Sequence, residues 1–272
     1  MSQPTIARTV AAVLCFALHC SLGVWNAQRT FADDPASSRS KADTEPPKHP
    51  NKDRIPQLGD IRAGRILFLG NSITLHGPAP VIGWLGNWGM AASERGKDYA
   101  HVLVNAIAEI TGRRPEALID NIADFERRYD TYDVRSGLKK HLAFKAGLVI
   151  VAIGENVPAL ASEQSRRVFM ASLVRLLKTL KANNNPTIVV RSCFWPDKTK
   201  DDILKQACAE AGGIFVDIGG LSKYESHYAR SERAYAHAGV AGHPGDKGMG
   251  VIAAALLEAM VARGEGKAPA AP

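Results

Sequence analysis

The stretch RILFLGNSIT, residues 65–74, decides the fold. Residues 66–69 are all apolar, which predicts a strand buried on both faces of a parallel sheet. Gly70 and Asn71 end this run, and because both residue types adopt positive φ at low cost, we expect a sharp turn there. Such a turn lifts the Ser72 hydroxyl off the carboxyl end of the strand, where open α/β sheets bind their ligands. Ser72 is therefore a candidate nucleophile.

Further apolar runs follow along the chain, and helical patterns separate them. The expected strands are 117–119, 148–153, 187–190 and 214–216, and the expected helices are 97–111, 162–181, 201–211 and 246–262. In the helix over 162–181, residues at helical spacing should face the core: Phe169, Leu173, Leu176, Leu177 and Leu180. Strands that alternate with helices predict one three-layer α/β/α domain around a parallel sheet of about five strands.

The two ends of the chain differ in composition from this domain. Residues 1–32 combine an early arginine, an apolar run and small residues near position 32, which predicts a secretory signal peptide; an uncleaved membrane anchor is the alternative. Residues 33–57 are rich in Pro, Ser and charge and read as a linker, and 266–272 as a flexible tail. The domain is thus expected over 58–265, in a periplasmic or secreted protein that is not stably inserted in a membrane after cleavage.

Charge and cysteine usage narrow the classes of partner and cofactor. The chain carries 34 Lys and Arg against 27 Asp and Glu, a net charge of +7. The charges are scattered rather than clustered, which argues against nucleic-acid binding. Cys193 and Cys208 match no metal motif, and in an exported protein they could form a disulfide or stay as two buried thiols. We expect no metal and no cofactor, and nothing in the sequence sets the oligomeric state.

Three polar segments follow predicted strands: 70–72 (GNS), 121–124 (NIAD) and 154–156 (GEN). In a doubly wound sheet the carboxyl ends of the strands converge, so these segments would supply a hydroxyl, backbone N–H groups and a side-chain amide to one place. His243 precedes the last predicted helix, and the following Pro244 disfavours a helical conformation for it. An imidazole on that loop could act as the base that activates Ser72.

These segments resemble the SGNH hydrolases of the GDSL-esterase group. The similarity rests on GNSIT (70–74), GEN (154–156) and HP (243–244), and block order and spacing agree over essentially the whole domain. The resemblance implies a flavodoxin-like sheet with strand order 2-1-3-4-5 and metal-free hydrolysis of esters. It also implies that Ser72 is the nucleophile and His243 the base. The oxyanion hole would comprise the backbone N–H groups of Ser72 and Ala123 and the side chain of Asn156.

The chain departs from the pattern of that family at two positions. Ala123 stands where the family usually has Gly, a change that keeps the backbone N–H. Val240 stands where the family usually has Asp, three residues before the histidine, and that Asp holds the correct imidazole tautomer. A backbone carbonyl, which would make a Ser-His dyad, or a carboxylate from another loop could replace it. Asp246 is near in sequence, but we expect it to be the N-cap of the last helix instead.

Two tryptophans, Trp84 and Trp88, lie on a Gly-rich loop after the nucleophile block. They could stack on sugar faces or simply cover the sheet edge, and Trp195 is a second candidate at the rim. The sequence thus predicts a serine esterase that acts on an O-acyl ester of a carbohydrate, with acetyl as the guessed acyl group. The alternatives are a non-catalytic glycan-binding module, which the missing Asp favours, and a lipid esterase or thioesterase.

Overall fold

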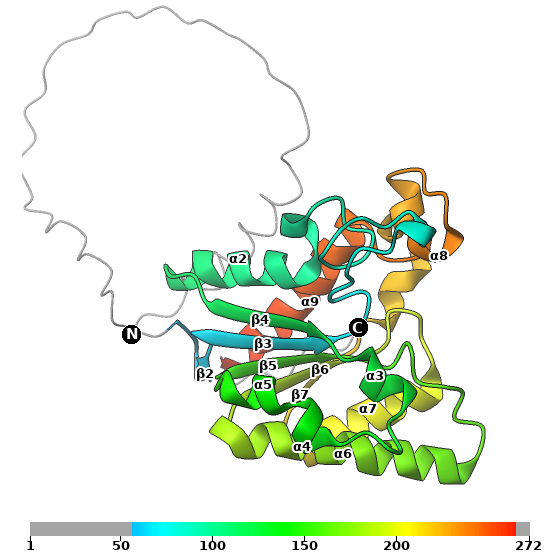
Figure 1. The fold of residues 1–272 in the computed structure, drawn as a ribbon. Coiled ribbons are helices and arrows are strands. Elements are labelled where there is room, and N and C mark those ends of the chain that lie inside the picture. Colours follow the sequence, from blue (N-terminus) through cyan, green and yellow to red (C-terminus); the bar gives the residue numbers. More distant parts are fainter. Residues whose placement is uncertain (1–55, 265–272) are drawn as a thin grey trace, which may run out of the picture. The chain divides into compact units, whose positions relative to one another are not determined.

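The computed structural model describes residues 56–264 (Figure 1). The predicted signal peptide, nearly all of the predicted linker and the predicted tail lie outside the described residues. Within 56–264, no helix combines the length and apolar character needed to cross a membrane.

A five-stranded parallel sheet forms the centre of the domain. Its strands are β3 (Arg65–Gly70), β4 (Glu116–Asn121), β5 (Leu148–Ala152), β6 (Thr187–Arg191) and β7 (Ile214–Val216). They lie side by side in the order β4-β3-β5-β6-β7, and every pair is parallel. In order of appearance along the chain this is 2-1-3-4-5, so the predicted topology is confirmed.

Helices cover both faces of this sheet (Figure 1). The longer ones are α2 (Tyr99–Thr111), α6 (Glu163–Asn184), α7 (Lys198–Glu210) and α9 (Asp246–Gly264), and the short ones are α3 (Ala123–Arg127), α4 (Val134–Gly137), α5 (Lys139–Ala143) and α8 (Ala238–Ala241). In Figure 1, α2 and α9 lie on one side of the sheet and α6 and α7 on the other. The three-layer α/β/α prediction is therefore confirmed.

The decisive strand β3 contributes to two hydrophobic cores because its side chains alternate between the faces of the sheet. Ile66 and Phe68 belong to the core under α2 and α9. Leu67 and Leu69 belong to the core over α6 and α7. The second core also contains the five apolar side chains of α6 that the helical spacing predicted to face inward. Burial on both faces explains why the strand sequence is continuously apolar rather than alternating.

Some elements differ from the prediction. A small hairpin of β1 (Gln57–Leu58) and β2 (Ile61–Arg62) precedes β3, and α3, α4 and α5 fill a stretch for which no element was predicted. Helix α7 begins three residues earlier than expected, where the side chain of Asp197 accepts the N–H of Lys200. Single turns of 3-10 helix occur in the loops at Pro80–Ile82, Arg95–Lys97, Gly219–Lys223, Glu225–His227 and Ala229–Ser231.

The predicted capping role of Asp246 is wrong. Asp246 is the first residue of α9, and its carboxylate accepts the backbone N–H and the hydroxyl of Ser93 at 2.7 and 2.6 Å. The carboxylate of Glu232 instead accepts the N–H groups of Asp246 and Lys247, both at 2.8 Å. A side chain from another loop therefore satisfies the first free N–H groups of this helix, and Asp246 ties the helix to the loop that contains Ser93.

Candidate active site

The turn after β3 presents Ser72 on a scaffold made by Asn71. The Asn71 side chain is fully buried, its Oδ1 accepts the N–H of Ile73 at 3.2 Å, and its backbone carbonyl accepts the N–H groups of Thr74 and Leu75. Gly70 is needed for space rather than for positive φ: a Cβ there would lie 1.9 Å from Thr74 Oγ1. Neither Gly70 nor Asn71 has positive φ, so the conformational reason given from the sequence is wrong although the turn exists.

The structure brings Ser72 and His243 together. Ser72 Oγ lies 2.9 Å from His243 Nε2, and His243 Nδ1 lies 2.7 Å from the carbonyl oxygen of Gly239. Because a carbonyl oxygen can only accept, Nδ1 must carry the hydrogen of the neutral ring. Nε2 is then the acceptor, and the Ser72 hydroxyl donates to it. This is the tautomer in which an imidazole can remove a proton from a serine.

A backbone carbonyl, rather than a carboxylate, contacts Nδ1 of His243. The side chain of Val240 is only 1% exposed and packs in a small apolar cluster with Trp84, Met90, Ala91 and Ala229. The carbonyl of Val240 accepts the backbone N–H of His243 at 3.0 Å, and Ala229 donates its N–H to the carbonyl of His243 at 2.9 Å. The histidine loop is therefore held at both its backbone and its ring without an acidic side chain.

Burial sets the protonation behaviour of His243. Removal from water lowers its pKa below 6.5, the hydrogen bond to Gly239 and the negative charge of Glu155 oppose this lowering in part, and His76 adds to it. The indole of Trp195 packs edge-on against the imidazole, with ring centroids 5.3 Å apart. The ring is thus neutral at pH 7, as a general base must be.

A buried polar network lies directly behind the nucleophile turn. Glu126 Oε1 accepts Asn71 Nδ2 at 3.2 Å and the backbone N–H groups of Gly154 and Asn156 at 2.7 and 3.1 Å. Glu126 Oε2 accepts the side-chain amide of Asn156 at 2.9 Å. Asn71 Nδ2 also donates to Glu155 Oε2 at 2.7 Å. The first and third predicted polar segments therefore meet on one carboxylate.

The two carboxylates of this network differ in their electrostatic environment. Burial alone would raise the pKa of Glu155. The ion pair with buried Arg191, 2.6 Å between Oε1 and a guanidinium nitrogen, and the hydrogen bonds from Phe194 and Asn71 together outweigh burial and lower it. Burial and the neighbouring charge of Glu155 raise the pKa of Glu126, and the N–H donors offset this only in part. Hydrogen bonds thus stabilise the Glu126 carboxylate, and within residues 56–264 it forms no ion pair with a cation.

In the second predicted segment, residues 121–124, the predicted oxyanion donor is already used in a local hydrogen bond. The N–H of Ala123, a predicted oxyanion donor, donates to Asn121 Oδ1 at 2.9 Å, and Asn121 Nδ2 donates to the carbonyl of Leu75 at 2.7 Å. Asn121 pairs with Gly70 in the sheet, so this segment does lie beside the nucleophile turn. Its N–H is engaged, whereas the amide nitrogen of Asn156 has a second hydrogen beyond the one given to Glu126.

The tryptophans of the Gly-rich loop pack mainly against that loop. Trp84 is 6% exposed and donates to the carbonyl of His76 at 3.1 Å, and Trp88 is half-buried and donates to the carbonyl of Ala92 at 2.9 Å. Their rings meet edge to face with centroids 5.6 Å apart, against Gly86. This packing favours the structural alternative for Trp84, while Trp88 and Trp195 keep part of their surface exposed.

Cys193 and Cys208 are free, buried thiols, so of the two alternatives the structure has unpaired cysteines. Burial raises the pKa of both, to about 11 for Cys208. Neither is therefore a reactive thiolate at neutral pH.

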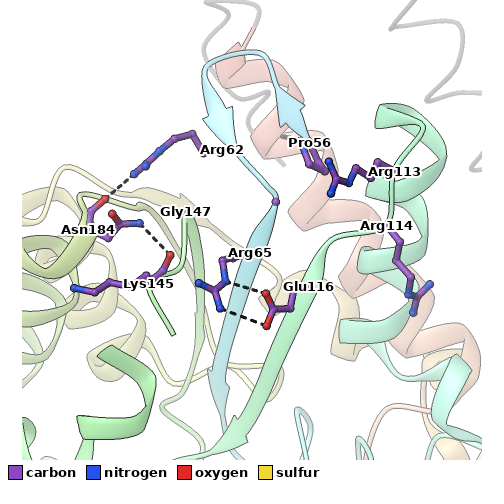
Figure 2. A pocket seen from close by; sticks show the side chains of 10 residues that line it. Pro56, Arg62, Arg65, Arg113, Arg114, Glu116, Lys145, Gly147 and Asn184 are labelled. Atoms are coloured by element: carbon purple, nitrogen blue, oxygen red, sulfur yellow. Dashed lines mark hydrogen bonds and ion pairs between the residues drawn. The ribbon is translucent and has the colours of Figure 1, made fainter. Parts of the chain in front are cut away.

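A cavity of about 410 Å³ lies at the opposite end of the sheet from Ser72. Arg65 and Glu116, the first residues of β3 and β4, form an ion pair in its wall at 2.9 Å, and Arg62, Arg113, Arg114 and Lys145 also line it (Figure 2). Because Ser72 follows the carboxyl end of β3, this cavity is separate from the Ser72–His243 pair.

Sequence reasoning missed three contributors to the candidate site. Glu126 lies in a stretch for which the sequence predicts no element, and the carbonyl of Gly239 has no signature in the sequence. Arg191 does leave a signal, since a charged residue that ends an otherwise apolar strand must find a buried partner. That partner is Glu155, in the segment that the sequence had already singled out.

At the level of sequence, no family model and no curated protein matches the chain. Among solved structures it is similar to one described as a family two carbohydrate esterase from Cellvibrio japonicus, with 18% sequence identity and a TM-score of 0.43. The match covers 74% of this chain and spans 61% of the length of that one.

Proposed function

We propose that the protein is a serine ester hydrolase that works through an acyl-enzyme, with Ser72 as nucleophile and His243 as general base. The observation that carries the proposal is the 2.9 Å contact between Ser72 Oγ and His243 Nε2, together with the Nδ1 contact to Gly239 that fixes the tautomer. Activated serine nucleophiles require a hydroxyl that is hydrogen-bonded to the unprotonated nitrogen of an oriented, neutral imidazole.

The reaction would proceed in two halves. Ser72 Oγ attacks the ester carbonyl while His243 Nε2 takes its proton, and the resulting imidazolium then gives that proton to the departing alcohol. Water attacks the acyl-enzyme with His243 again as base, and the acid product leaves as Ser72 regains its hydrogen. The carbonyl of Gly239 accepts Nδ1–H throughout and so stabilises the imidazolium in each half of the reaction. Because this acceptor is neutral, it stabilises the imidazolium less strongly than a carboxylate would.

The tetrahedral intermediates carry a negative oxygen that needs hydrogen-bond donors. We assign this role to the backbone N–H of Ser72 and to the second amide hydrogen of Asn156. Ala123 remains a proposed third donor, and its N–H would have to turn from Asn121 to serve.

The proposed substrate is an O-acyl ester of a carbohydrate, with acetyl as the guessed acyl group. The partly exposed rings of Trp88 and Trp195 support this choice, because aromatic faces pack well against sugar rings. The main argument for a non-catalytic glycan-binding module was the missing Asp at position 240. It loses weight because Gly239 supplies the acceptor that the imidazole needs.

The test is hydrolysis of p-nitrophenyl acetate by the purified protein and by Ser72→Ala, with Ser136→Ala on exposed helix α4 as the matched control. We expect turnover in the parent and the control and loss of at least about 1000-fold in Ser72→Ala. Fluorophosphonate labelling followed by peptide mapping should place the adduct on Ser72. Turnover that survives in Ser72→Ala, or an adduct on another residue, would refute the assignment; glycan binding without any turnover would favour the module.

A further inference from the structure

Glu126 has no part in the Ser72–His243 chemistry, yet it is fully buried beside it. Four N–H groups converge on its carboxylate, from Asn71, Gly154 and twice from Asn156. Burying a carboxylate without a cation is costly, so a structure that keeps one must use many donors to hold it. The carboxylate in turn dictates how those donors are oriented.

We infer that Glu126 is a positioning residue for the oxyanion hole, an inference that rests on the proposed function. Its carboxylate accepts Asn156 Nδ2 and so fixes the orientation of that side-chain amide. The same carboxylate accepts Asn71 Nδ2 from the turn that presents Ser72. Two groups that must stay in register during catalysis, the nucleophile turn and the oxyanion donor, are thus held by one side chain on α3.

The orientation of the Asn156 amide follows from donor and acceptor chemistry. Asn156 Nδ2 donates to Glu126 Oε2, and because an ionised carboxylate only accepts, Nδ2 rather than Oδ1 must face it. One hydrogen of Nδ2 is used in that contact, and the second points away from the carboxylate, free for an oxyanion. If the amide were reversed, Oδ1 would replace this nitrogen and the hydrogen offered to the oxyanion would be lost.

Replacement of Glu126 by glutamine should produce this reversal. The glutamine amide has one oxygen and one nitrogen, and three donors converge at the Oε1 position but only one at Oε2. Its oxygen should therefore take the Oε1 position and its nitrogen the Oε2 position, where it faces Asn156. Two donors would then oppose each other, and Asn156 relieves the conflict by turning its oxygen inward.

A competing effect predicts the opposite result. The negative charge of Glu126 repels the negative oxygen of the intermediate, so its removal alone would speed the reaction. In other enzymes, loss of one oxyanion donor lowers turnover by about 100-fold or more. If the Asn156 amide hydrogen contributes as much, its loss outweighs the gain from removing the charge of Glu126. The sign of the change in kcat therefore decides between the two effects.

The experiment compares kcat and KM for p-nitrophenyl acetate in the parent, Glu126→Gln, Asn156→Ala and the double variant. Asp120→Asn is the control: Asp120 is a carboxylate on β4 that is hydrogen-bonded to buried His141 at 2.6 Å, outside the site. We expect kcat to fall by about 10- to 100-fold in Glu126→Gln with KM within about threefold, and the double variant to be no slower than Asn156→Ala. The Asp120→Asn control should keep its kcat.

A structural readout accompanies the kinetics. The side-chain amide resonances of Asn156 in a ¹⁵N-labelled sample, assigned by their absence in Asn156→Ala, should shift in Glu126→Gln and stay in place in Asp120→Asn. If Glu126→Gln fails to fold, Glu126→Asp serves instead: its shorter side chain should lower kcat several-fold.

The outcomes separate this inference from the proposed function. A parent enzyme without Ser72-dependent turnover refutes the proposed function and this inference with it. An active parent together with a Glu126→Gln variant of equal or higher kcat refutes the inference alone, as do losses that add up fully in the double variant or parental kcat in Glu126→Asp.

Discussion

Val240→Asp, which introduces the carboxylate that the sequence resemblance led us to expect, should lower the stability of this protein and should not raise its activity. The Val240 side chain lies in the apolar cluster under Trp84, and the ring nitrogen that an acid would orient is already bonded to Gly239. Loss of two buried methyl groups costs about 2 kcal/mol, as Val240→Ala should show by itself. The carboxyl adds to this, because at pH 7 it must stay charged in an apolar site or take up a proton.

The cost of taking up that proton gives the scale of the second contribution. To protonate a carboxyl of pKa about 3.9 at pH 7 costs about 4 kcal/mol, which caps the charge penalty. Val240→Asp should therefore lose up to about 6 kcal/mol of the free energy of unfolding, a large part of the stability of a typical domain. Because burial raises the pKa of this carboxyl in the folded state, the loss should be smallest below pH 4 and grow as the pH rises.

Urea denaturation at pH 4 and pH 7 measures the effect, with Val240→Asn as the neutral control of similar shape. The aspartate and asparagine variants should differ by several kcal/mol at pH 7 and converge at pH 4. Turnover of folded Val240→Asp should not exceed that of the parent. An aspartate variant of parental stability and raised kcat would show that the side chain at position 240 reaches the imidazole, and would refute the role of the Gly239 carbonyl.

Two further predictions test the site. Because burial lowers the pKa of His243 and the base must be neutral, kcat/KM should rise with pH through a midpoint below 6.5, and a midpoint at or above 7 would contradict the buried, carbonyl-bonded ring. Gly154 has a φ of +129° and a Cβ there would lie 2.5 Å from Cys193 Sγ, so Gly154→Ala should lose about 2–4 kcal/mol in urea denaturation together with activity. Gly220→Ala, where a Cβ meets open space, is the control, and equal stabilities of the two variants would contradict the account.

The sequence predicted the sheet because each central strand is buried on both faces, which produces short, continuously apolar runs such as residues 66–69. The long helix α6 could be predicted equally well, since its buried apolar side chains recur at helical spacing from Phe169 to Leu180. The hairpin of β1 and β2 and the short helices after β4 were missed because two to five residues hold no period that could be recognised.

The residues of the candidate site likewise comprise some that the sequence pattern identifies and others that only the structure reveals. Ser72, Asn156 and His243 follow from residue type and from their place at strand ends or before a helix, and the structure brings Ser72 and His243 into contact. The role of Glu126 depends on tertiary contacts with residues far along the chain. The Gly239 carbonyl lies only four residues before His243, but a backbone carbonyl leaves no side-chain signal in the sequence. Asp246 was assigned to the nearest helix end, but the tertiary fold gives that end to Glu232 and directs Asp246 to Ser93.

Ser72 and His243 are separated by 171 positions, and the histidine comes directly before the last helix of the domain. During synthesis the nucleophile strand therefore leaves the ribosome well before the imidazole does. A polypeptide that ends before residue 243 lacks the base proposed for Ser72, so the proposed chemistry must wait until the loop before α9 lies beside the nucleophile turn. Under the proposed function, a chain that has not finished folding would leave the esters around it intact.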